Sequence, residues 1–177
     1  MDIISIILLA LIIASLFNAI FIVKQQTTAV IERFGKFVRI ANPGINIKIP
    51  FIERVSGRLS MRIMQLDVPV ETKTEDNVFV NVSISVQYFV LKDKEFEAFY
   101  KLDNTEQQIT AYVFDVVRAR VPKLPLDDLF EKKDDIADAV KDELTEIMEQ
   151  FGYGIVKALV TDLDPVSYTH LTLPTKA

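Results

Sequence analysis

The chain of 177 residues has no cysteine, a single histidine and only five glycines. Without cysteine there is no disulfide framework, no thiol nucleophile and no thiolate metal site. The glycines are too scattered for a phosphate-binding loop, and neither G-x-x-x-x-G-K-[ST] nor G-x-S-x-G occurs. His170 alone cannot complete a Ser-His-Asp triad or a zinc site. The sequence therefore predicts a protein that is not an enzyme and that has no cofactor and no metal ion.

Charge is unevenly distributed along the chain, although the net charge is only −5. Residues 24–62 hold eight cations and two anions, whereas residues 63–165 hold eleven cations and 22 anions. The basic segment favours contact with anionic lipid headgroups, but two ordinary solvated faces explain the same counts. The pI of about 5.0 and the lack of basic patches interleaved with aromatics argue against nucleic acid.

Acidic residues are dense between positions 127 and 138. A cation site and a solvated helix face both fit this density, and acids near a helix N-terminus favour the second interpretation. The residues concerned are Asp127, Asp128, Glu131, Asp134, Asp135 and Asp138.

The longest hydrophobic run extends from Ile3 to Val23 without a charge. As a helix, 21 residues would extend about 31 Å, the thickness of a bilayer core. A cleaved signal peptide would begin with a positive region, whereas this chain begins Met-Asp; a re-entrant or buried segment is the other alternative. We therefore expect residues 1–24 to form a single-pass membrane anchor, with anchor residues that include Ile3, Ile7, Leu11, Phe17 and Val23.

The charges that flank this run predict its orientation. Only Asp2 and the amino terminus precede it, whereas several cations and the single anion Glu32 follow it. Because positive charge next to a membrane span favours the cytoplasmic side, we expect the body of the protein to face the cytoplasm. The candidate contacts with the membrane surface are Lys24, Arg33, Lys36 and Arg39.

Hydrophobic periodicity predicts an α+β fold after the anchor. Short alternating segments with turns at Gly35 and at residues 42–44 indicate a β-rich part, about residues 25–70. A strand with period 2 covers residues 76–90, and two helices follow at 104–121 and 126–151, with a final strand at 155–160. The α/β part is then about residues 71–165. Asn104 is the expected N-cap of the first helix, and Gly152 is placed to end the second.

Several stretches in order resemble one family. They are AVIERFGKFVRIANPGINIKIPFIERV, QLDVPVETKTEDNVFVNVSISVQY, FYKL, VFDVVRARVPKLPLDDLFEKKDDIADAVKDEL and FGYGIVKALVTDLDP. Together they are similar to the SPFH or band 7 proteins (stomatin, prohibitin and flotillin), and most of all to bacterial stomatin-like and plant hypersensitive-induced-reaction proteins. The resemblance covers residues 25–165.

This resemblance implies two packed subdomains, membrane attachment, ring-like homo-oligomers and a scaffolding role in membrane microdomains. Some members of the family regulate membrane proteases, so a regulatory partner of such a protease is the alternative function. The family has no catalytic residues to carry over. We further expect Arg118 and Arg120 to meet acids of the helix around residues 127–146, within or between protomers, as oligomer-contact candidates.

The end of the chain departs from the family pattern. Relatives continue into a long charged helix that forms a coiled coil, whereas this chain ends VSYTHLTLPTKA. Residues 166–175 can be written in codons that match the reverse complement of a common transposase-library sequencing adapter. We therefore expect residues 166–177 to be a non-native tail on a truncated chain.

Overall fold

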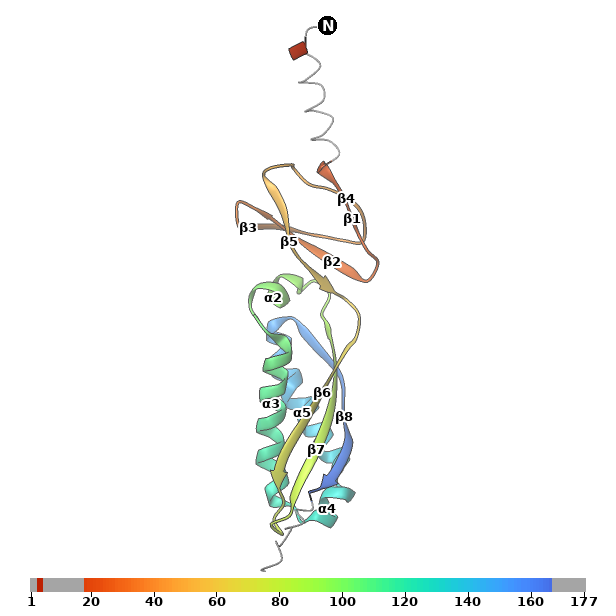
Figure 1. The fold of residues 1–177 in the computed structure, drawn as a ribbon, viewed down its shortest axis with the longest axis vertical. Helices are drawn as coiled ribbons and strands as arrows, with labels where there is room; N and C mark the ends of the chain where they lie inside the picture. Colours follow the sequence, from red (N-terminus) through yellow and green to blue (C-terminus); the bar gives the residue numbers. More distant parts are fainter. Residues whose placement is uncertain (1–2, 5–17, 167–177) are drawn as a thin grey trace, which may run out of the picture. The chain divides into compact units, whose positions relative to one another are not determined.

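The computed structural model describes residues 3–4 and 18–166 (Figure 1). The strands are β1 (Ile20–Val23), β2 (Thr27–Arg33), β3 (Lys36–Ala41), β4 (Gly44–Ile47), β5 (Glu53–Ser60), β6 (Met64–Lys73), β7 (Phe79–Val90) and β8 (Tyr153–Pro165). The helices are α2 (Glu95–Tyr100), α3 (Thr105–Arg120), η1 (Val121–Lys123), α4 (Leu126–Glu131), α5 (Lys133–Met148) and η2 (Glu149–Phe151). The predicted α+β class is confirmed.

The chain divides into two compact units, each discontinuous in sequence. Of the described residues, the first unit comprises 3–4, 18–64, Phe89–Asp103 and Met148–Gly154. The second comprises Gln65–Tyr88, Asn104–Ile147 and residues 155–166.

The first unit contains two small sheets, one of order β3-β2-β5 and one formed by β1 and β4. Strand β2 is the centre of the larger sheet and pairs antiparallel with both neighbours. The β2–β3 hairpin around Gly35 is confirmed. Four buried residues and two half-buried ones form a core cluster, namely Val23, Ala29, Ile31 and Ala41 with Phe21 and Val55.

Helix α2, which the sequence did not predict, supplies aromatic side chains to the first unit. Phe96 and Tyr100 pack edge-on against Phe37 of β3, with ring centroids 4.9 and 6.0 Å from its own. The ring of Phe99 lies so close to Gly57 that a Cβ at that position would be 2.3 Å from it. The glycine in β5 is therefore required by close packing.

The second unit contains the sheet of order β6-β7-β8, and Figure 1 shows α3 running along its length. The buried side chains of β7 include Val80, Val82, Ile84 and Val86, as the period-2 pattern predicts. Asn104 caps α3 by accepting a hydrogen bond from the Gln107 amide, and the predicted apolar face of α3 is buried at Ile109, Val113, Val116 and Val117.

Two predicted elements differ from the structure. The helix predicted for residues 126–151 is divided at Lys132 into α4 and α5, although neither proline nor glycine marks the break. The hydrophobic run does not continue as a helix to Val23, because Ile20–Val23 form β1 and pair with β4. Val23 is 2% exposed in the core of the first unit, so its assignment to the anchor is wrong.

The remaining anchor residues Ile7, Leu11 and Phe17 lie outside the described residues, as does the tail from residue 167 onward. Ile3 is described and is exposed. Within residues 3–4 and 18–166, no helix combines the length and the apolar character needed to cross a membrane.

Candidate membrane-facing surface

Four isoleucines form an exposed apolar face on the two-stranded sheet of the first unit. Ile20 lies opposite Ile47, and Ile22 lies opposite Ile45 in the antiparallel register. Because side chains alternate along a strand, Phe21 and Val23 point to the core while the isoleucines point away from it. The exposed fractions are 57% for Ile20, 68% for Ile47, 66% for Ile22 and 77% for Ile45. We refer to them as the isoleucine face.

Two turns of the first unit each carry an exposed phenylalanine. Phe34 and Gly35 join β2 to β3 with φ values of 50° and 80°, and Phe51 precedes β5 with φ of 66°. The phenylalanines are 83% and 88% exposed. A non-glycine residue in left-handed conformation costs about 1–2 kcal/mol, and an exposed apolar ring gains little from burial. Phe34 and Phe51, which we call the turn phenylalanines, are therefore poor choices for folding alone.

The turn phenylalanines lie at the same end of the β3-β2-β5 sheet. Arg33, the last residue of β2, is the register partner of Glu53, the first residue of β5. The residues just beyond this pair consequently lie at one edge of the sheet, the edge formed by the end of β2 and the start of β5. They line a shallow open pocket of about 480 Å³, formed by Phe34, Gly35, Phe51, Ile52, Glu53 and Arg54.

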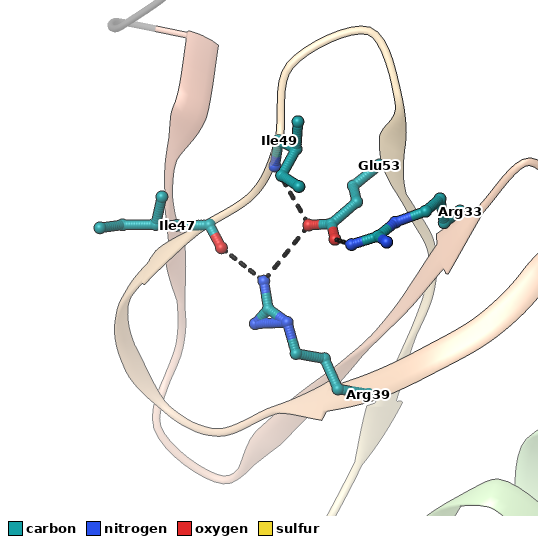
Figure 2. Close-up of polar contacts among 5 residues, drawn as sticks. All are labelled: Arg33, Arg39, Ile47, Ile49 and Glu53. Atoms are coloured by element: carbon teal, nitrogen blue, oxygen red, sulfur yellow. Dashed lines mark hydrogen bonds and ion pairs between the residues drawn. The ribbon is translucent and has the colours of Figure 1, made fainter.

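The buried carboxylate of Glu53 joins the segments at this edge (Figure 2). Its Oε1 accepts a hydrogen bond of 2.8 Å from Arg33, and its Oε2 accepts one of 3.1 Å from the Ile49 amide. Arg39 approaches Oε2 at 3.5 Å and donates to the carbonyl oxygen of Ile47. Hydrogen bonds from Arg33 and the Ile49 amide, together with the Arg39 charge, hold the pKa of Glu53 below its ordinary value.

A second buried carboxylate belongs to Glu32, the residue before Arg33 in β2. Arg54 donates to its Oε2 at 3.0 and 3.2 Å, and the Tyr100 hydroxyl donates to its Oε1 at 2.8 Å. Hydrogen bonds from Ser56, Tyr100 and Arg54 lower the pKa of Glu32. Burial, together with the same hydrogen bond to Glu32, raises the pKa of Tyr100 to about 12, so the phenol stays a donor at physiological pH.

The burial of these two carboxylates determines which charges are exposed in the basic segment, residues 24–62. Glu32 and Glu53 are the only anions between residues 24 and 62, and they are 5% and 6% exposed. The exposed charges of the segment are therefore all cationic. Among the membrane-surface candidates, Lys24, Arg33 and Lys36 are exposed, whereas Arg39 is half-buried against Glu53.

The oligomer-contact candidates lie in the second unit. Arg118 lies over the ring of Phe114, with its guanidinium carbon 5.0 Å from the ring centroid. Arg120 lines an open groove beside α5, together with the acids Asp142, Glu143 and Glu146. Arg120 is thus near acids of the predicted helix region, and a contact between protomers stays a prediction.

The isoleucine face and the turn phenylalanines were not predicted as a surface. The available signals were a Phe-Gly pair at a hairpin turn, where Asn-Gly is usual, and three apolar residues at positions 49, 51 and 52 of a turn segment. The two ion-paired carboxylates had no local signal, because their pairing depends on the register of β2 against β5.

The fold and this surface define a two-part α+β domain with an apolar and cationic face. The chain belongs to the SPFH domain / Band 7 family, whose model matches residues 21–170. Proteins of this family are generally membrane-associated scaffolds without catalytic activity.

Curated relatives support this assignment. The chain is 47% identical over 144 residues to hypersensitive-induced response protein 4 of Arabidopsis thaliana, covering 81% of this chain and 49% of the relative. It is 28% identical over 147 residues to human mitochondrial stomatin-like protein 2, covering 82% and 41%. It is 32% identical over 149 residues to the uncharacterized protein MJ0827 of Methanocaldococcus jannaschii, covering 84% and 73%. The chain therefore spans half or less of the length of the first two relatives.

Proposed function

We propose that this protein is a membrane-anchored scaffold that self-associates and organises membrane microdomains, with its body on the cytoplasmic side. Family membership supports a membrane-associated scaffold. The observation that carries the proposal is the isoleucine face. Its four adjacent isoleucines form an exposed apolar patch that is not part of the core of the folded protomer.

The bilayer is the occupant that best fits this face. Strand β1 follows directly on the uncharged sequence that begins at Ile3, so the face is continuous in sequence with the proposed anchor. The exposed charges of the same segment are cationic, and each cation near an anionic membrane surface contributes about 1 kcal/mol. Apolar contact and headgroup attraction thus act together at the first unit.

Vesicle flotation with the full chain tests the membrane contact. We expect the wild-type protein to float with vesicles of phosphatidylcholine and phosphatidylglycerol. Because the proposed anchor keeps every variant on the vesicles, contact of the isoleucine face is measured with Ile45→Trp, which should lose intensity when the acyl chains carry bromine. The matched control is Phe79→Trp in the second unit, where the native side chain is 42% exposed, and it should keep its intensity.

These variants separate the possible occupants. An unquenched tryptophan at position 45 in bound protein would exclude the isoleucine face as a membrane contact. If replacing Ile22 and Ile45 with serine then reduced the particle size in mild detergent, the occupant would be a second copy of the chain. Failure of the wild-type chain to float would refute membrane attachment altogether.

Self-association is tested by chemical cross-linking in membranes. We expect cross-linked homo-oligomers, and the Arg118→Glu, Arg120→Glu variant should lose them if these arginines lie between protomers. Unchanged cross-linking in that variant would exclude this interface. Recovery of a stoichiometric membrane protease with the wild-type chain would favour the alternative function, a regulatory partner of that protease.

A further inference from the structure

The turn phenylalanines combine two unfavourable properties that the other left-handed residues do not share. Among residues 3–4 and 18–166, the other non-glycine residues with positive φ are Gln26, Asn77 and Asp93, all of them polar. Asparagine and aspartate tolerate this conformation, and polar side chains are stable in water. Phe34 and Phe51 have neither compensation, so contact with something outside the protomer is the reason to retain them.

The charges around these turns indicate what that contact is. Arg33 and Lys36 flank the first turn, and Arg54 follows the second; all three are exposed. The nearby carboxylates Glu32 and Glu53 are buried, and they are ion-paired with Arg54 and Arg33, two of these exposed cations. A phenylalanine tip surrounded by exposed cations fits the boundary between anionic headgroups and acyl chains. An acidic protein partner would satisfy the cations but would leave the rings in water.

The tip is also joined to the isoleucine face by specific hydrogen bonds. Arg39 donates to the Ile47 carbonyl at the end of β4 and contacts Glu53 at the start of β5. Glu53 in turn binds Arg33, the residue before Phe34, and the Ile49 amide, two residues before Phe51 (Figure 2). The Glu53 carboxylate is therefore bonded to residues close to both phenylalanine turns. Through Arg39 it is also linked to the end of β4, the strand that carries Ile45 and Ile47.

We propose that Phe34 and Phe51 insert together into the bilayer as a second membrane contact, and that Glu53 is the positioning residue that keeps the two rings at one edge. The inference rests on the proposed membrane attachment and extends it to a defined pair of side chains. Glu53 acts through Arg33, Arg39 and the Ile49 amide and does not itself touch lipid.

Substitution of Glu53 distinguishes positioning from simple electrostatics because the two predict opposite effects. Glu53→Gln removes one negative charge and releases two arginines, so electrostatics alone predicts tighter binding to anionic vesicles. Positioning predicts that the turns separate and the rings insert less deeply. The experiment must therefore measure ring depth separately from total binding.

The absence of tryptophan from the chain makes ring depth measurable. The single-tryptophan variants Phe34→Trp and Phe51→Trp are examined in the full chain on vesicles of phosphatidylcholine and phosphatidylglycerol, with and without bromine in the acyl chains. Both should shift their emission to the blue and lose most of their intensity in brominated vesicles. Phe79→Trp in the second unit is the matched control and should show neither change.

The outcomes separate this inference from the proposed function. Bound protein that is quenched in both single-tryptophan variants supports insertion, whereas bound protein that is quenched in neither refutes insertion and leaves membrane attachment standing. Chain that does not bind vesicles at all refutes the proposed function. Quenching in only one of the two variants would refute joint insertion.

The positioning role is tested by adding Glu53→Gln to both tryptophan variants. Glu32→Gln is the control, because it removes an equally buried carboxylate from the same sheet with the same change in charge. We expect Glu53→Gln to lose much of the quenching and Glu32→Gln to retain it. Equal losses would show general loosening of the sheet, and no loss with Glu53→Gln would show that Glu53 does not position the rings.

A second variant keeps the test valid if Glu53→Gln does not fold, as judged by circular dichroism. Arg39→Gln removes one partner of Glu53, and the Arg39 side chain is 39% exposed, so the variant should fold. It should reduce quenching at Phe51→Trp, because the tie between β4 and β5 is lost. Unchanged quenching in a folded Arg39→Gln variant would refute the positioning role.

Discussion

Replacement of Phe34 by asparagine should make the protein more stable and its membrane contact weaker. Phe34 occupies the first position of a two-residue hairpin turn in which both residues have positive φ, and asparagine followed by glycine is the preferred pair there. The substitution should recover much of the roughly 1–2 kcal/mol that a left-handed phenylalanine costs. The opposing loss is small, because the residue is already 83% exposed.

The size of that loss follows from the buried part of the ring. A phenylalanine that buries about 200 Å² when fully covered has only a small part of that area covered here, about 35 Å². At about 25 cal/mol per Å² the loss is at most about 0.9 kcal/mol. The net expectation is an increase of about 0.1–1 kcal/mol in the free energy of unfolding, or a rise in Tm of up to about 4 °C.

Two measurements are compared for this variant. Thermal or urea unfolding in mild detergent gives the change in stability, with Phe34→Leu as the control that keeps an apolar side chain in the same strained conformation. Quenching of Phe51→Trp in brominated vesicles gives the membrane contact, which should weaken when Phe34→Asn is added and persist when Phe34→Leu is added. A loss of more than about 0.5 kcal/mol in the asparagine variant would show that the Phe34 ring packs within the folded protein, and the argument from exposure would fail.

Three further outcomes are expected. Val82→Asp should cost more than about 3 kcal/mol because it buries a charge at a fully buried position of β7, whereas Ser83→Asp on the other face should cost less than half as much; equal costs in unfolding experiments would contradict the assignment of faces. Gly57→Ala should cost about 1–3 kcal/mol because its Cβ would meet the Phe99 ring at 2.3 Å, and Phe99→Leu should relieve most of this cost in a double-mutant cycle. The pKa of Glu53 is lowered, so its ionised form stabilises the fold at pH values above the ordinary carboxyl pKa, and this contribution disappears as the pH falls through the lowered value. The free energy of unfolding of Glu53→Gln should therefore depend less on pH in the acid range than that of the wild type. An unchanged pH dependence would show that Glu53 contributes nothing.

Local pattern predicts the second unit well. The buried face of β7 and the apolar face of α3 follow from periods of 2 and 3.6 residues, which depend only on near neighbours in sequence. The cap at Asn104 is likewise a local feature and is present, as is the left-handed Gly152 of the first unit. The break at Lys132 has no such signal, since Lys132 and its neighbours Glu131 and Lys133 all have good helix propensity.

The first unit was harder to predict for two physical reasons. The segment IFIV at residues 20–23 is apolar enough for a membrane span and rich enough in β-branched residues for a strand, so hydropathy alone could not place its boundary. The unit also recruits Phe89–Asp103 and Met148–Gly154. Contacts between segments so distant in sequence leave no periodic trace, and the hydrogen bond from Tyr100 to Glu32 is one of them.

The inward orientation of both carboxylates determines how the candidate membrane surface responds to solution conditions. Each is ion-paired with an arginine that is itself exposed: Glu53 with Arg33 and Glu32 with Arg54, whose side chains are 46% and 71% exposed. The surface therefore presents cationic side chains and apolar groups, and the charge of these two arginines is partly neutralised from within the unit. Salt screens the first contribution over about 10 Å at 0.1 M, but it does not weaken the insertion of apolar side chains. The two contributions are therefore separable: tryptophan quenching that survives high salt measures the insertion of the isoleucine face and the turn phenylalanines, and the part that salt removes measures the exposed cations.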